Sequence, residues 1–95
     1  MVHQTTDNRQ EHRFEVFADG QTAFLTYKRT PKALTLVHTE VPRALRGQGV
    51  GDALIEAALH VGRSAGLLIV AECPFARAYL RKHPASIAPG PTPQI

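Results

Sequence analysis

The residues with the clearest chemical potential form a glycine-rich turn near the middle of the chain, Arg46-Gly47-Gln48-Gly49-Val50-Gly51. The turn lies between a strand-like segment and a helical segment. Amide groups in the first turn of a helix have no partner within the helix, and the helix dipole adds partial positive charge there. Glycines let the backbone approach a bound oxygen closely. The turn therefore predicts a site for phosphate or pyrophosphate, with Arg46 adding a charged contact.

Two familiar phosphate-binding motifs do not describe this turn. The P-loop ends in Gly-Lys-Ser/Thr, which the chain lacks. The Rossmann fingerprint needs a glycine where this chain has Asp52, and it opens with a strand–helix–strand unit. A flexible loop that only begins a helix is the remaining alternative to an anion site.

Four side chains outside the turn could move a proton or form a covalent bond: His38, Glu40, Cys73 and Tyr79. His38 and Glu40 are two residues apart on a predicted strand, so both point to the same face and either could accept a proton. Cys73 precedes a predicted helix, where a thiol can be activated as an acid or a covalent relay. It could equally be a pocket wall or a small buried hydrophobe. The phenol of Tyr79 could donate a proton or simply pack.

The elements that position these residues can be predicted from the hydrophobic pattern. Strand-like segments cover residues 14–19, 23–28 and 34–41, with Asp19-Gly20 and a break at 29–32 between them. This pattern predicts an antiparallel three-strand meander. A helical period follows over residues 51–65, then a continuous apolar run over 67–71 and a second helix over 75–82. On the first helix, one apolar face gathers Leu54, Ile55, Ala58, Leu59, Val61 and Ala65.

The predicted order is β-β-β-α-β-α, an α/β (α+β) fold in which the fourth strand lies parallel to the third. Because the run at 67–71 is continuously apolar, we expect that strand to be covered on both faces. Residues 1–12 are polar and expected to be unstructured, as is the proline-rich tail at 85–95. Residues 13–84 then form a single small domain.

Composition excludes several classes of protein. The 95 residues carry a net charge of +3, and their basic residues are spread along the chain without a nucleic-acid-binding motif, so no nucleic-acid partner is expected, although a basic nucleic-acid-binding domain stays a third alternative. The one cysteine cannot form an intramolecular disulfide, and no signal peptide or membrane-length apolar run is visible, so a reducing cytoplasm is expected. A metal site from His38, Glu40, Cys73 and His83 would need scattered ligands, so no metal is expected. An exposed sheet edge could support a weak homodimer; otherwise we expect a monomer.

Three stretches carry a resemblance to a known family: residues 38–42, the glycine turn with Leu45 before it, and residues 73–79 followed by His83-Pro84. The glycine turn matches the Arg/Gln-x-x-Gly-x-Gly/Ala signature of the GNAT N-acetyltransferase superfamily. The three stretches together resemble its small, single-domain YjdJ-like subfamily. The resemblance implies a truncated GNAT fold over residues 13–84 that binds acetyl-CoA where the third and fourth strands separate.

The resemblance also implies roles for individual residues. It implies transfer of an acetyl group to an amine, on a small molecule or a peptide, with acetyl-CoA as cosubstrate. Tyr79 matches the tyrosine that protonates the departing thiolate, one residue closer to the preceding strand than in typical members. The N-terminal helices that usually build the acceptor side are missing, which leaves a non-catalytic module that binds coenzyme A as the alternative. The cofactor-binding residues implied are Val41, Arg46, Gly47, Gln48, Gly49, Val50, Gly51, Cys73, Phe75 and Tyr79.

Overall fold

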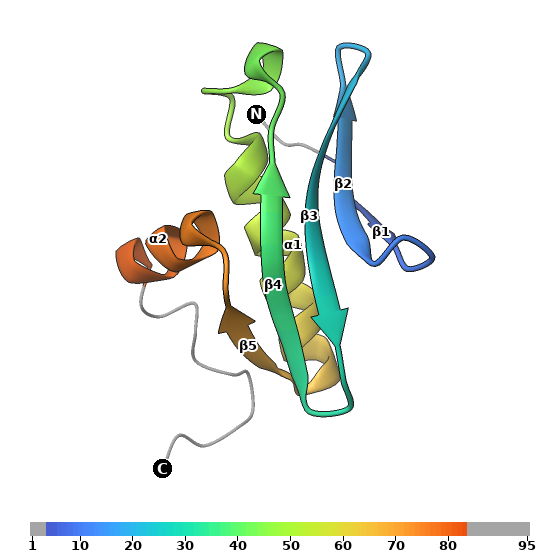
Figure 1. Ribbon diagram of the computed structural model, residues 1–95, viewed down its shortest axis with the longest axis vertical. Coiled ribbons are helices and arrows are strands. Elements are labelled where there is room, and N and C mark those ends of the chain that lie inside the picture. The colour runs from blue at the N-terminus through green and yellow to red at the C-terminus, as the bar shows by residue number, and fades with distance from the viewer. Residues whose placement is uncertain (1–3, 84–95) are drawn as a thin grey trace.

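One five-stranded sheet and two helices make up the part of the chain that the computed structural model describes, residues 4–83 (Figure 1). The strands are β1 (Thr6–Asn8), β2 (Arg13–Ala18), β3 (Gln21–Arg29), β4 (Ala33–Glu40) and β5 (Leu68–Ala71), and the helices are α1 (Val50–Ala65) and α2 (Pro74–Lys82). A short 3-10 helix, Arg43–Leu45, leads from β4 into the glycine turn. The predicted Pro-rich segment at 85–95 lies outside the described residues.

The sheet has the order β1-β2-β3-β4-β5, with antiparallel pairing from β1 to β4 and parallel pairing between β4 and β5. The meander and the parallel fourth pairing predicted from the sequence are therefore confirmed. At the turn between β2 and β3, Asp19 and Gly20 both have positive φ, 51° and 72°. Two consecutive positive values are those of a type I′ turn, whose twist suits a tight hairpin.

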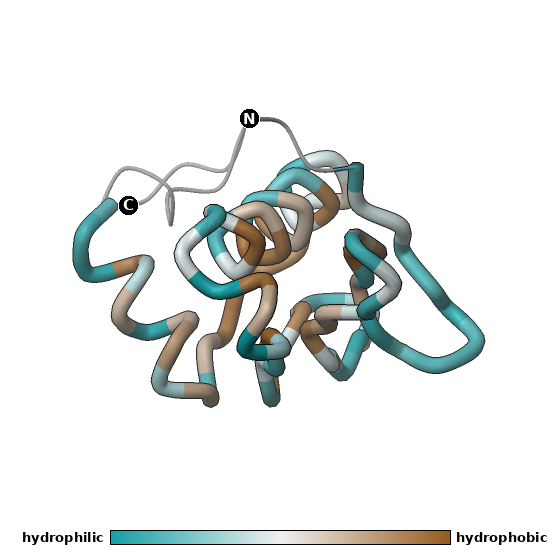
Figure 2. The backbone as a smooth tube through the Cα atoms, turned by 90° about the horizontal axis from the view of Figure 1, so that it is seen from above, coloured by the Kyte–Doolittle hydropathy of each residue, from teal (hydrophilic) through white to brown (hydrophobic). Residues whose placement is uncertain are grey.

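Helix α1 covers one face of the sheet and forms the core with it (Figure 2). It begins after Gly49 and ends at Ala65, and the next residue, Gly66, has a φ of 70°, which suits glycine just after a helix C-terminus. Ala65, which the pattern placed on the buried face, is exposed because it is the last residue of the helix; Gly62, one turn earlier, is buried instead. The largest fully buried side chains are Phe14, Val16, Leu25, Leu34, Leu36, Leu45, Val50, Leu54 and Ile55.

The other face of the sheet has no helix on it among residues 4–83. Leu68 and Val70 of β5 point to that face, and they are 58% and 41% exposed. The prediction that this strand is covered on both faces was wrong, because a four-residue strand at the sheet edge needs only one face in contact with α1.

A short strand near the N-terminus was not expected. Residues 1–12 were predicted to be unstructured, but Thr6–Asn8 forms β1 and pairs with β2. The hydroxyl of Tyr27 donates a hydrogen bond of 2.6 Å to Asp7. This bond gives the polar segment a tertiary contact that its own composition does not reveal. Neither of the two helices is long and apolar enough to cross a membrane.

Candidate functional site

The candidate site begins where the pairing of β4 with β5 ends. Parallel pairing joins residues 33–36 of β4 to residues 68–71 of β5 and then stops. The amides of Glu72 and Cys73 both donate to the carbonyl of Leu36, at 2.9 and 3.2 Å, and the chain then turns into α2. Strand β4 continues to Glu40 while paired only with β3. The last four residues of β4 therefore border the place where the two strands diverge.

A β-bulge reverses which side chains of β4 face the helix. Leu36 lies opposite Tyr27, but the next registered pair is His38 opposite Thr26, so Val37 is an extra residue. Leu34 and Leu36 point into the core before the bulge. After the bulge, Thr39 lies opposite the buried Leu25 and shares its face. The bulge therefore turns Thr39 toward α1. It turns His38 and Glu40 toward the other face of the sheet, which has no helix on it among residues 4–83 and which we call the open face.

The register also fixes the backbone direction at Thr39. The amide of Tyr27 donates to His12, which lies toward β2, so alternation directs the amide and carbonyl of Thr26 toward β4. The backbone N–H and C=O of His38, the partner of Thr26, are therefore directed toward β3. Alternation then points the N–H and C=O of Thr39 away from β3, toward the space that β5 has left.

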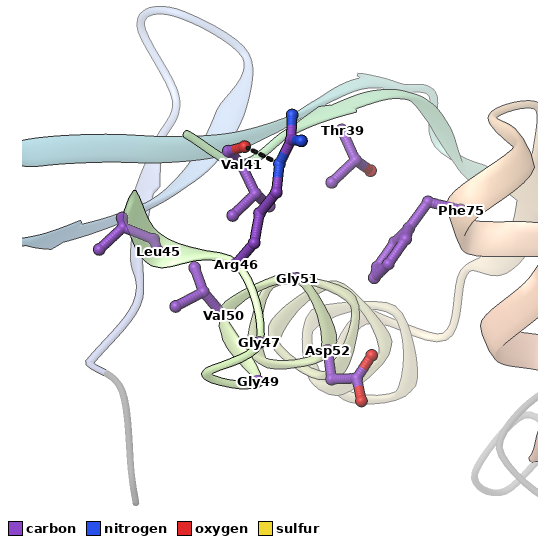
Figure 3. Close-up of a pocket in the computed structure, with 10 residues that line it drawn as sticks. All are labelled: Thr39, Val41, Leu45, Arg46, Gly47, Gly49, Val50, Gly51, Asp52 and Phe75. Atoms are coloured by element: carbon purple, nitrogen blue, oxygen red, sulfur yellow. Dashed lines mark hydrogen bonds between the residues drawn. The ribbon is translucent and has the colours of Figure 1, made fainter. Parts of the chain in front are cut away.

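A pocket of about 500 Å³ occupies this divergence (Figure 3). One wall is the end of β4, the base is the glycine turn with the start of α1, and the opposite wall is the ring of Phe75 from α2. The lining residues are Thr39, Val41, Leu45, Arg46, Gly47, Gly49, Val50, Gly51, Asp52 and Phe75.

The glycine turn presents helix amides to this pocket. Gly47 and Gly49 have φ values of 81° and 77°, and a Cβ at either position would meet no atom within 4 Å. The first hydrogen bond within α1 runs from the amide of Ala53 to Gly49, at 3.0 Å. The amides of residues 50–52 therefore have no acceptor inside the helix and point out of its N-terminus. This arrangement suits an anion.

Arg46 and Asp52 bring opposite charges to the same pocket. The Nε of Arg46 donates to the carbonyl of Val41 at 3.1 Å, which holds the guanidinium at the pocket rim (Figure 3). Asp52 lies in the first turn of α1, where a carboxylate stabilises the helix dipole. Its charge would weaken the attraction of the pocket for an anion, so Arg46 and the helix amides have to outweigh it.

Phe75 depends on the absence of a side chain at position 51. A Cβ on Gly51 would lie 2.5 Å from Cζ and 2.9 Å from Cε2 of the Phe75 ring. The ring therefore lies directly against the first turn of α1 (Figure 3). Gly51 thus has a packing role as well as the amide role that the sequence suggested.

Cys73 is buried just behind the pocket and does not line it. It precedes α2 as its N-cap, and its Sγ accepts a hydrogen bond from the amide of Ala76 at 3.4 Å. The same sulfur lies 3.4 Å from Oγ1 of Thr39, a residue that does line the pocket. The thiol is therefore one side chain away from the pocket.

Tyr79 is buried between the two helices and also lies outside the pocket lining. Its hydroxyl donates to Glu56 of α1 at 2.9 Å, and its ring stacks on His83 at 4.3 Å. Burial, followed by the hydrogen bond to Glu56, raises the pKa of Tyr79 to about 12. The phenol is protonated at neutral pH, but its proton is engaged by the carboxylate of Glu56.

His38 and Glu40 form a pair on the open face. The Nε2 of His38 lies 3.2 Å from Oε1 of Glu40, and the side chains are 59% and 62% exposed. The prediction that the two share a face holds, but that face is opposite the one that carries Thr39 and Val41. Between residues 4 and 83, no three His, Cys, Asp or Glu side chains are grouped to hold a metal ion.

The structure brings most of the predicted cofactor-binding residues into one pocket: Val41, Arg46, Gly47, Gly49, Val50, Gly51 and Phe75. Gln48 lies in the turn without lining the pocket, and its side chain donates to the carbonyl of Ala44 at 3.2 Å. The sequence missed Thr39, Leu45 and Asp52. The alternation of β4 would have revealed Thr39 only if the bulge at Val37 had been known.

Comparison with known proteins identified one family. The family model described as GCN5-related N-acetyl-transferase matches residues 13–88. No curated protein matched the sequence.

Proposed function

This chain belongs to the GCN5-related N-acetyltransferase family, and on that premise we propose that it transfers an acetyl group from acetyl-CoA to an amine. The observation that carries the proposal is that helix amides, Arg46 and the diverging end of β4 meet in one pocket. A cytoplasmic location is part of the proposal and rests on the lone cysteine, which is free and buried.

The residues of the pocket suit the pyrophosphate and the pantetheine arm of coenzyme A. The backbone of residues 47–51 and the amide of Asp52 would hold the pyrophosphate, with Arg46 adding charge-assisted hydrogen bonds. The N–H and C=O of Thr39 would pair with the amide groups of the pantetheine arm, which Val41 borders. Phe75 would form the opposite wall. Bound acetyl-CoA supplies a thioester whose carbonyl carbon is open to attack by an amine.

His38 and Glu40 would prepare the amine. A lysine amine has a pKa of about 10.4 in water, so a base must take its proton before attack at neutral pH. Either member of the pair can accept that proton, and the 3.2 Å contact lets the two share it. The extra backbone residue Val37 precedes His38, and its amide would be a candidate to stabilise developing negative charge on an oxygen.

Two side chains are candidates to protonate the departing thiolate. Cys73 is closer to the pocket because its sulfur contacts Thr39 at 3.4 Å, so we favour it. Tyr79 is the alternative, and it would have to exchange its hydrogen bond with Glu56 for one with the thiolate.

The cofactor site can be tested at Gly49, with Gly66 as a matched control. Both glycines have positive φ, both flank α1, and a Cβ at either meets no atom within 4 Å. A leucine at either position costs about 1–2 kcal/mol of backbone strain. Of the two positions, only 49 lines the pocket. In calorimetric titrations we expect Gly49→Leu to weaken acetyl-CoA binding at least tenfold and Gly66→Leu to change it less than twofold. Equal affinities for the two variants would remove the turn from the site.

A non-catalytic module that binds coenzyme A is the second candidate function. The bond from Tyr79 to Glu56 favours it, because that bond holds the expected acid away from the pocket. Release of free coenzyme A thiol with an acetylated amine as product distinguishes the two. Tight binding without any product would favour the binding module.

A further inference from the structure

If acetyl-CoA occupies the pocket as proposed above, an acceptor can reach the thioester from only one side. Helix α1 and the core close the face of the sheet that carries Thr39 (Figure 2). On the other face, His38 and Glu40 lie at the border where β4 has lost its β5 neighbour. The acceptor nitrogen must therefore approach across the open face, next to this pair.

Apolar side chains flank the pair on both sides. Phe24 of β3 lies opposite Glu40 in the register, and its ring centre is 6.2 Å from that of His38. Val70 of β5 lies opposite Thr35, just below the point of divergence, and is 41% exposed. We call Phe24, His38, Glu40 and Val70 the acceptor face.

Two carboxylates lie near Phe24, and one of them, that of Glu40, is placed to contact a cation from an acceptor. The guanidinium of Arg13 lies 4.6 Å above the Phe24 ring and is paired with Glu15. Glu40 contacts no arginine or lysine among the ion pairs of residues 4–83; its partner is His38. An alkylammonium group could therefore reach Glu40 while its methylene stem lies along Phe24.

The acceptor face is too exposed to enclose a small amine. A small ligand usually needs a concave site that buries most of its surface. Here both members of the His38–Glu40 pair are more than half exposed, and no helix of residues 4–83 covers this face of the sheet (Figure 2). An acceptor held on such a surface must bring apolar area of its own, as a polypeptide does.

We infer that the acceptor is a lysine side chain of a polypeptide that lies across the acceptor face with apolar residues beside the lysine. In the reaction, the neutral lysine nitrogen attacks the thioester carbon and forms the amide bond, and its proton passes to the His38–Glu40 pair. The carbon–sulfur bond breaks, and the thiolate of coenzyme A takes up a proton.

The test compares two kinds of amine with the full chain and acetyl-CoA. One is a twelve-residue peptide with a blocked N-terminus and a central lysine between leucines; the other is a set of small amines, n-butylamine, lysine methyl ester and spermidine. We expect kcat/KM for the peptide to exceed that of each small amine at least tenfold. Small amines as good as the peptide would overturn the inference and leave the transferase proposal standing. Failure to bind acetyl-CoA in calorimetry would instead overturn the proposed function.

Substitutions on the acceptor face, and one beside it, test where the peptide binds. Phe24→Thr and Val70→Thr should each raise KM for the peptide at least fivefold with unchanged affinity for acetyl-CoA. Phe17→Thr is the matched control, because Phe17 points to the same face but lies one strand away, opposite Thr22 near the hairpin turn. We expect it to change KM less than twofold. Equal effects at positions 17 and 24, or none at 24, would overturn the acceptor face.

Discussion

At the scale of single residues, the site depends on a close contact between a glycine and an aromatic ring. Alanine at position 51 would gain about 1 kcal/mol of helix propensity, but its Cβ would push the Phe75 ring away. These effects oppose each other, so we expect Gly51→Ala to stay within about 1 kcal/mol of wild-type stability. The displaced ring should weaken acetyl-CoA binding by threefold to tenfold in calorimetry.

Gly62 provides the control for this prediction. It is also a buried glycine of α1, and a Cβ there would lie 2.5 Å from the flexible end of Ile69, away from the pocket. Gly62→Ala should therefore disturb packing to a similar degree and leave acetyl-CoA binding unchanged. If Gly51→Ala also binds like the wild type, Phe75 is not part of the cofactor site.

The chemistry of the turn could be predicted from residue types alone, because amides at a helix start and the conformational freedom of glycine are local properties. The roles of Cys73 and Tyr79 could not. Their partners, Thr39 and Glu56, are 34 and 23 residues away in the sequence. Whether a buried phenol faces a cofactor or a carboxylate is decided by which helix packs beside it.

At the scale of elements, the sequence predicted strands β2 to β5 and helices α1 and α2, and it missed β1 and the 3-10 helix at Arg43–Leu45. What it could not predict was the bulge at Val37, which reverses the alternation of β4 and separates Thr39 from His38 and Glu40. The apolar residues change phase there, from Leu36 to Val37, but two adjacent apolar residues are common in a strand and do not by themselves identify a bulge. The short edge strand β5 was misread for a related reason: a continuous apolar run does not reveal where a sheet ends.

A partly buried hydrogen bond from Tyr79 to Glu56 joins helix α2 to α1. Tyr79→Phe should lower the free energy of unfolding by about 0.5–1.5 kcal/mol, measured by urea titration. Because the hydroxyl is engaged by Glu56, we expect kcat to change less than threefold. A double-mutant cycle with Glu56→Gln should show that the two losses are not additive. A hundredfold loss of kcat in Tyr79→Phe would contradict this and assign the thiolate proton to Tyr79.

At the scale of the whole molecule, two tyrosines join the periphery to the central sheet and α1. Tyr27 holds β1 through Asp7, as Tyr79 holds α2 through Glu56. Burial, followed by the hydrogen bond to the carboxylate, raises the pKa of both Tyr27 and Tyr79 from 10.0 to about 12. The folded protein therefore keeps the two phenolic protons at a pH where the unfolded chain releases them.

This difference predicts a loss of stability in alkaline solution. Between pH 10 and pH 12 the native state binds more protons than the unfolded state, so the free energy of unfolding falls as the pH rises. The contribution of the two phenols is fully present below pH 10 and is lost as the pH passes 12. A Tyr27→Phe/Tyr79→Phe variant lacks it and keeps every other titrating group. In urea titrations from pH 8 to pH 12, the wild type should be the more stable protein at pH 8, and the difference should shrink above pH 10. A difference that stays constant up to pH 12 would mean that the two phenols titrate alike in the folded and unfolded chains, and that their bonds to Asp7 and Glu56 do not hold in solution.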